Sequence, residues 1–206
     1  MLTELKGKTI VVIGAHPDDI EIGCGGLLSH LSVPTRDNTV MAIVLSCSTA
    51  RHKEAMDGLK LLGVPMGMAT ILSLPDGSIT PSPEAIAAVE QTVKHANVIF
   101  TMSPWDTHQD HRAAYEISCS ACRRMEATLI SYHSISSTPE FRPHVFVDVA
   151  SAFPRKMAAL RCHKSQAGKE YMRRAWLETW HHDKQATAAG LNLVELYHIH
   201  KSFCQV

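Results

Sequence analysis

The sequence predicts an α/β protein: a single-domain, Rossmann-like three-layer sandwich in which helices cover both faces of a mostly parallel sheet. Short apolar runs rich in Val and Ile alternate along the chain with segments of helical periodicity, the order expected for parallel strands joined by helices. The 206 residues, 45% hydrophobic and 19% charged, are typical of one globular domain. Because no repeat, low-complexity tract or linker divides the chain, we expect a single domain over residues 1–206.

Strands are predicted where short apolar or β-branched runs lie between turn signals. Residues 9–13 read Thr-Ile-Val-Val-Ile, and this unbroken apolar character is typical of a strand buried on both faces of a parallel sheet. The same reasoning predicts further strands at residues 39–45, 69–72, 98–102, 128–132, 144–148 and 193–199.

Helical patterns occupy most of the segments between these strands. Gly63 and Pro65 together are a termination signal for the helix that precedes them, and Pro83 is favourable in a first helical turn. Ser151 is predicted to cap a helix that begins near Phe153. Helices are therefore expected at residues 21–31, 53–62, 83–95 and 109–124, from residue 153 onward, and at 170–184.

Charge and hydropathy exclude several kinds of partner. Lys plus Arg and Asp plus Glu both number 20, so bulk charge does not favour a nucleic acid or a membrane surface. No apolar run is long enough for a membrane span, and the run near the N-terminus is too short for a signal peptide, so a cytoplasmic location is expected. Six cysteines are expected to be reduced thiols there: Cys24, Cys47, Cys119, Cys122, Cys162 and Cys204.

Two segments rich in histidine and carboxylate follow predicted strands. The first, His16-Pro17-Asp18-Asp19, comes after strand 9–13, and the second, His108-Gln109-Asp110-His111, comes after strand 98–102. Side chains beyond the carboxyl ends of parallel strands collect in one crevice where the strand order reverses. His108 and His111 are three residues apart, so one helical turn directs both towards the same place.

Such a cluster is typical of a catalytic metal. Zinc in enzymes takes three protein ligands, often His and carboxylate, and keeps a position for water, whose pKa falls from about 15.7 to about 7. A further carboxylate can serve as general base, and a protonated His can stabilise an oxyanion. Two histidines and one carboxylate also hold the iron of non-haem oxygenases, so this ligand set leaves Fe²⁺ and oxygen chemistry open.

The two segments together resemble the paired signatures of the LmbE-like (PIG-L) zinc N-deacetylases. The matching residues are His16-Pro17-Asp18-Asp19-x-Glu21 with its following Gly-Cys-Gly-Gly, and Pro104-x-Asp106-x-His108-x-Asp110-His111. Weaker matches at Arg51-x-x-Glu54, Leu74-Pro75-Asp76-Gly77 and His163-Lys164-Ser165-Gln166 extend the resemblance over most of residues 9–166.

The resemblance implies a role for each matching residue. Three residues would hold the metal: His16, Asp19 and His111. Asp18 would be the general base acting on metal-bound water, and His108 the acid and oxyanion stabiliser. Asp110 would keep the His108 imidazole oriented and protonated, while Glu21 would support the first motif.

The implied reaction is removal of an acetyl group from an N-acetylglucosamine-type conjugate, with Zn²⁺ or Fe²⁺ as cofactor. The expected partner is this small molecule, and relatives of this kind are often homo-oligomers. Arg51 and Gln166 are candidate substrate contacts, whereas Trp105 fits either a sugar-stacking role or core packing equally well. The segment 46–51 is shorter than the Thr-x-Gly-Glu loop of the family, so another small amide stays an alternative substrate.

Other features favour structural roles. Gly23-x-Gly25-Gly26 follows an acidic cluster that would repel a pyrophosphate, so these glycines are expected to allow close helix packing instead of dinucleotide binding. His198 and His200, like His181 and His182, are expected to be partly exposed histidines and not a second metal site.

Overall fold

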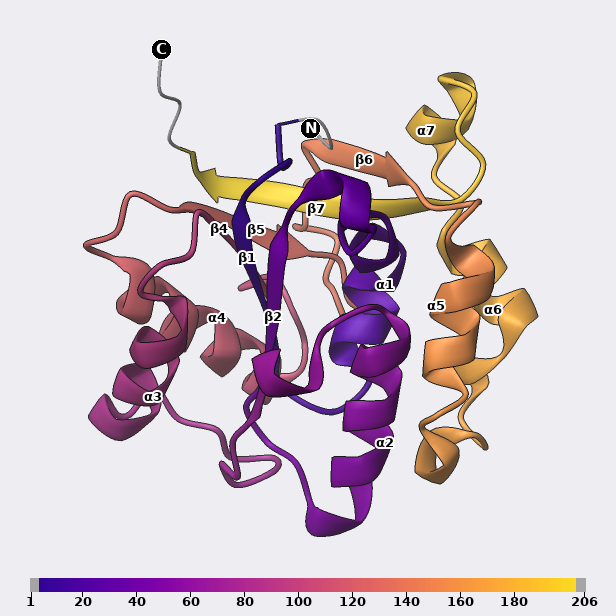
Figure 1. The fold of residues 1–206 in the computed structure, drawn as a ribbon. Helices are drawn as coiled ribbons and strands as arrows, with labels where there is room; N and C mark the ends of the chain where they lie inside the picture. Colours follow the sequence, from indigo (N-terminus) through magenta and orange to yellow (C-terminus); the bar gives the residue numbers. More distant parts are fainter. Residues whose placement is uncertain (1–3, 203–206) are drawn as a thin grey trace.

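The computed structural model describes residues 4–202, which form one seven-stranded sheet with helices on both faces (Figure 1). The strand order is β3-β2-β1-β4-β5-β7-β6. The strands are β1 (Thr9–Gly14), β2 (Thr39–Val44), β3 (Ala69–Ile71), β4 (Val98–Thr101), β5 (Thr128–Tyr132), β6 (Val145–Asp148) and β7 (Val194–Lys201). The α-helices are α1 (Asp19–Leu31), α2 (Thr49–Leu61), α3 (Pro83–Val93), α4 (Gln109–Cys122), α5 (Phe153–Leu160), α6 (Arg174–Trp180) and α7 (Lys184–Ala188).

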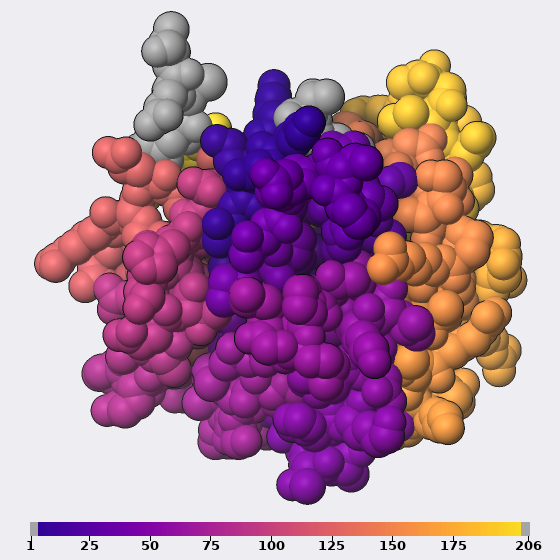
Figure 2. All heavy atoms as spheres, viewed as in Figure 1, coloured from indigo at the N-terminus to yellow at the C-terminus, as the bar shows by residue number. Residues whose placement is uncertain are grey.

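The predicted fold class is confirmed. Strands β3, β2, β1, β4 and β5 pair in parallel, and β7 pairs antiparallel with both β5 and β6. Helices α1, α2 and α5 pack together on one side of the sheet, and α3 packs with α4 on the other (Figure 1). In the space-filling view, the orange segment that contains α5 lies directly against the purple N-terminal part of the chain (Figure 2).

Strand β1 lies inside the sheet, as its apolar sequence predicts. Residues Ile10 to Ile13 are fully buried, and each branched side chain packs well on the pleated surface. Burial of each such side chain stabilises the fold by about 1.5–3 kcal/mol. This rigid strand leads directly into the His16-Pro17-Asp18-Asp19 segment.

The glycines of α1 allow that helix to lie close to the sheet. A Cβ atom on Gly23 would lie 2.2 Å from the ring of Tyr132, and one on Gly26 would lie 2.4 Å from Val149. The predicted packing role of these glycines is therefore confirmed.

The strand order reverses between β1 and β4, because the chain adds β2 and β3 on one side of β1 and the later strands on the other. The segments after β1 and β4 consequently diverge at this point and leave a crevice between them. The two segments rich in histidine and carboxylate, residues 16–19 and 108–111, both lie at this crevice.

Three predictions about helices were wrong. Residues 170–184 do not form one helix: a short 3-10 turn, Glu170–Met172, precedes α6, and Asp183 then accepts hydrogen bonds from Gln185 N–H and Ala186 N–H as the N-cap of α7. Ser151 does not cap α5, whose N-cap position is Ala152. Helix α2 begins at Thr49, ahead of the expected residue 53, which places Arg51 in its first turn.

None of the helices within residues 4–202 combines the length and apolar character that a membrane crossing requires. The cysteines in this part of the chain are free thiols, and Cys204 lies outside the described residues. His181, expected to be partly exposed, is buried instead, with 1% of its surface exposed.

Candidate active site

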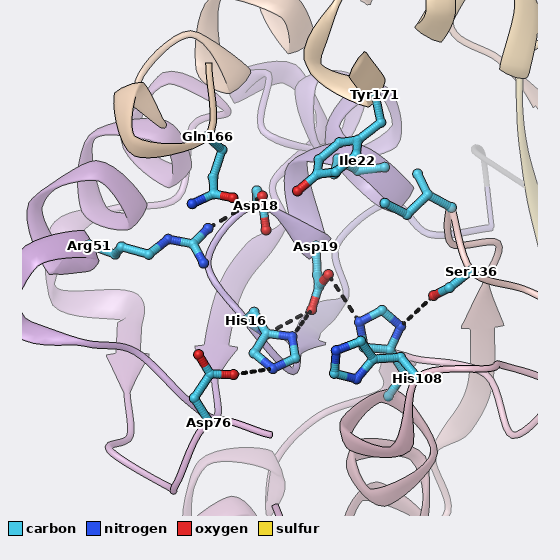
Figure 3. Close-up of a pocket in the computed structure, with 12 residues that line it drawn as sticks. His16, Asp18, Asp19, Ile22, Arg51, Asp76, His108, Ser136, Gln166 and Tyr171 are labelled. Atoms are coloured by element: carbon cyan, nitrogen blue, oxygen red, sulfur yellow. Dashed lines mark hydrogen bonds and ion pairs between the residues drawn. The ribbon is translucent and has the colours of Figure 1, made fainter. Parts of the chain in front are cut away.

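A pocket of about 310 Å³ opens at the crevice between the segments that follow β1 and β4 (Figure 3). Asp19, in the first turn of α1, lies at its centre. One carboxylate oxygen of Asp19 is 3.4 Å from Nε2 of His111, and the other is 3.5 Å from Nδ1 of His16. That second oxygen also accepts a 2.7 Å hydrogen bond from the backbone N–H of His16, which holds the turn in place.

The outer nitrogen of each imidazole contacts a further carboxylate. His111 Nδ1 lies 2.9 Å from Asp106 Oδ2, and His16 Nε2 lies 2.9 Å from Asp110 Oδ2. The side chains of both aspartates are fully buried. Such contacts fix the orientation of an imidazole and leave its other nitrogen to a metal. In both rings that other nitrogen faces Asp19.

This arrangement fits a divalent metal ion. Ligand atoms from His16, Asp19 and His111 all lie within 4.8 Å of one another. Two imidazole nitrogens and one carboxylate oxygen are a usual donor set for catalytic zinc. A second group, His16 with His108 and Asp110, meets the same distance limit. It fits less well, because the Asp110 carboxylate already accepts hydrogen bonds from two backbone N–H groups, at 2.7 and 3.0 Å.

Attraction between the two imidazoles and their neighbouring carboxylates dominates the electrostatics of the site. Burial lowers the pKa values of His16 and His111, but Asp19 together with Asp110 or Asp106 raises them to about 9 and about 10, respectively. Burial likewise opposes ionisation of Asp19, yet His111 and His16 hold its pKa well below the usual range. Because a metal binds deprotonated imidazole, it would replace the protons that these groups share.

Asp18 has an unusual backbone conformation beside this group. Its φ of 97° lies in the left-handed region, which costs a non-glycine residue about 1–3 kcal/mol and is found chiefly at functional sites. The carboxyl group is nearly buried and lines the pocket. Burial, reinforced by Asp19, raises the pKa of Asp18 to about 7, while Arg51 at 3.3 Å opposes the rise. A pKa near the working pH suits a general base.

His108 stands on the opposite side of the pocket as the N-cap of α4. Its Nδ1 accepts a 3.2 Å hydrogen bond from the backbone N–H of Asp110, so the proton of the neutral ring is on Nε2. The ring stacks on His111, with 4.6 Å between centroids. Burial and the two neighbouring imidazoles lower the pKa of His108.

The role expected for Asp110 differs from its contacts. Its carboxylate hydrogen-bonds to His16 and to the backbone of the Gly77–Ile79 turn, and only its backbone N–H orients His108. The charge of Asp110 does favour protonation of His108, but burial and the other imidazoles outweigh it. Asp110 is the second residue of α4, so its backbone N–H is one of the free donors at the helix start, and this group reaches the side chain of the N-cap His108.

Two of the three expected substrate contacts line the pocket. Arg51 and Gln166 do so, and the Arg51 guanidinium also donates a hydrogen bond to the carbonyl of Pro17. Trp105 does not: its ring packs against His198 and His200, with centroids 4.6 and 5.6 Å away. Of the two roles left open for Trp105, its contacts correspond to packing.

Glu21, expected to support the first motif, is buried and lies 3.0 Å from Nε2 of His163. This contact ties α1 to the segment after α5. Neither residue lines the pocket or belongs to a candidate metal-binding group of the described residues.

Two further residues of the site received no role from the sequence: Asp106, which is buried and contacts His111, and Tyr171, which lines the pocket. Asp106 accepts hydrogen bonds from the hydroxyls of Ser134 and Ser136 as well as contacting His111, although its place in the second motif was a signal that could have identified it. Tyr171 lines the pocket from the 3-10 turn within the segment that had been predicted as helix. Nothing in its local sequence distinguishes it from an ordinary helical tyrosine.

Two sequence comparisons identify the family of this chain. The family model described as PIG-L: GlcNAc-PI de-N-acetylase matches residues 11–122. The uncharacterized deacetylase YaiS of Escherichia coli (strain K12) is 34% identical over 175 residues, which cover 78% of this chain and 92% of that protein.

Solved structures share the fold at lower identity. The N,N'-diacetylchitobiose deacetylase of Pyrococcus horikoshii is 20% identical with a TM-score of 0.77, over 93% of this chain and 83% of its own. The 4-carboxy-2-hydroxymuconate hydratase of Pseudomonas putida KT2440 is 16% identical with a TM-score of 0.80, over 97% and 98%. At identities of 20% and 16%, these two structures establish the fold alone. The family match and the YaiS relative decide the assignment: this chain belongs to the PIG-L family of deacetylases.

Proposed function

We propose that this chain is a metal-dependent hydrolase that removes the acetyl group from an N-acetylglucosamine-type conjugate. The observation that carries the proposal is the group His16, Asp19 and His111, in which one nitrogen of each imidazole faces the Asp19 carboxylate at the centre of the pocket. Zinc suits this donor set, and ferrous iron is accommodated by the same atoms. A single domain over residues 1–206 is part of the proposal.

A bound metal would supply a Lewis acid for the amide carbonyl and for the water that attacks it. Asp18 then accepts a proton from that water, because its raised pKa makes the carboxylate a competent base near neutral pH. His108 directs its Nε2–H into the pocket, since its Nδ1 is occupied by the Asp110 N–H. The lowered pKa of His108 leaves its ring neutral, so its Nε2–H stabilises negative charge on the carbonyl oxygen and does not serve as the acid that the resemblance implies. The proton that Asp18 takes from water passes to the departing amine, which leaves Asp18 ionised again.

The pocket supports a sugar as the amine part of the substrate. Arg51, Asp76 and Gln166 present a guanidinium, a carboxylate and an amide, which together bind hydroxyl groups well. A cavity of about 310 Å³ is at the small end of ligand sites, so it suits one amino sugar with the remainder of the conjugate outside. The family description and the chitobiose enzyme, both concerned with N-acetylated glucosamine, support the same class.

The test is to incubate the protein with a panel of N-acetylglucosamine conjugates, with and without dioxygen. We expect acetate and free amine in equal amounts, regardless of oxygen. Substrate consumption without acetate would contradict deacetylation, and consumption that requires oxygen would favour the iron oxygenase chemistry of the same ligand set.

A further inference from the structure

The two sides of the pocket differ in chemistry. Figure 3 shows the polar side chains Arg51, Asp76 and Gln166 on one side of Asp19, and Ile22 on the other. Ile135 and the ring of Tyr171 also line the pocket and, with Ile22, make up what we call the apolar wall. Neither catalysis nor binding of sugar hydroxyls accounts for this wall.

Ile22 closes the inner end of the apolar wall. It lies on α1 one turn after Asp18 and Asp19, so it shares their face of the helix. Only 4% of its surface is exposed. Behind it stands a cluster of packed apolar side chains: Phe153, Met157, Leu160 and Leu177.

The other two members of the wall lie further out. Tyr171 packs on the same cluster as Ile22, and Ile135 lies in the segment after β5 with 37% of its surface exposed. The wall therefore has a closed inner end at Ile22 and an open rim at Ile135.

The planarity of an amide connects the two sides. In a trans amide, the acyl chain attached to the carbonyl carbon and the substituent on the nitrogen point in opposite directions. When the carbonyl lies at the His16–Asp19–His111 group and the hydroxylated sugar contacts the polar side, the acyl group extends along the apolar wall. Each methylene that reaches this wall leaves water, which favours binding until the chain meets Ile22.

We propose that the apolar wall is an acyl subsite and that Ile22 sets the length of the acyl group that is removed. The inference rests on the proposed function and adds the acyl part of the substrate to it. In the reaction, water adds its oxygen to the acyl carbon, the carbon–nitrogen bond breaks, and the products are a short-chain carboxylate and the protonated amine.

The first test compares hydrolysis of N-acetyl-, N-propionyl- and N-butyrylglucosamine. Ile22→Ala is expected to raise kcat/KM for the butyryl over the acetyl substrate by about tenfold relative to wild type. Ile22→Val, which keeps most of the buried side chain and so protects the fold, is expected to shift the ratio in the same direction by less. Leu61→Ala, which shortens an exposed apolar side chain of α2 outside the pocket lining, is the control and is expected to leave the ratio near that of wild type.

The second test does not require turnover. Binding of acetate, propionate, butyrate and valerate to the purified protein is measured by NMR line broadening. We expect the carboxylate that binds best to have a longer chain in Ile22→Ala than in wild type, and the same chain length in Leu61→Ala as in wild type. If the order of affinity among the four carboxylates is the same in both Ile22 variants as in wild type, the inference is overturned. If that order shifts toward longer chains but no substrate is hydrolysed, the subsite is retained and the proposed deacetylation is rejected.

Discussion

At the residue scale, the site depends on a few side chains whose neighbours fix what they can do. Asp18 keeps a left-handed backbone at the pocket, and Asp106 and Asp110 each occupy one nitrogen of a candidate ligand. The sequence identifies Asp18 as a candidate because a histidine and two carboxylates follow the first strand, and the family resemblance implies its role as base. It does not reveal that Asp110 contacts His16, since that pairing depends on how the 77–79 turn folds over α4.

Replacing Asp18 by Asn tests the proposed base. Asn tolerates the left-handed backbone, so the fold and the bound metal are expected to be retained. Loss of the base is expected to lower kcat by about 10²–10⁴-fold. Acetate release and metal content per chain are measured together, and wild-type turnover in Asp18→Asn would exclude the assigned role.

Asp106→Asn tests whether the buried carboxylate orients His111. Removal of such a partner is expected to weaken metal binding by about 10–100-fold. Metal affinity is measured by competition with a chelator, and the exposed Asp57→Asn is the control that should bind like wild type. An Asp106→Asn protein with unaltered affinity would show that His111 needs no such support.

At the element scale, α1 is held by a buried ionic cluster as well as by its glycines. Lys156 on α5 lies 2.6 Å from Glu195 on β7, and Glu195 also accepts hydrogen bonds from the backbone of Gly26 and Leu27 on α1. Sequence patterns located all three elements but not this cluster, because the two charged residues are far apart in the chain and each resembles a surface residue. The break of the 170–184 segment into shorter helices was not predicted for a related reason. Asp183 caps a new helix at a point where periodicity alone favours one continuous helix.

Lys156→Met tests the energetic role of this cluster. The change leaves Glu195 buried without its counter-charge, which is expected to lower the free energy of unfolding by about 3–5 kcal/mol. Lys53→Met, which breaks an exposed pair with Asp57, is expected to leave the free energy of unfolding nearly unchanged. Urea denaturation compares the two, and equal small losses would mean that the buried pair contributes no more than a surface one.

At the scale of the whole molecule, the reversal of strand order between β1 and β4 creates the site. Alternation of strands and helices predicts the parallel sheet, and the residues after the first and fourth strands predict where the crevice lies. The insertion of β7 between β5 and β6 was not predicted, because antiparallel pairing of a C-terminal strand is decided by long-range contacts. The pocket's outer residues, such as Tyr171, depend on the same long-range packing.

The most direct test of the central claim is a zinc titration of metal-stripped protein, with acetate release from an N-acetylglucosamine conjugate as the signal. We predict no release from the stripped protein and a rise that ends when one zinc per chain has been added. His111→Ala should show no such rise. Full acetate release from protein shown to be free of metal would contradict a metal-dependent deacetylase at this site.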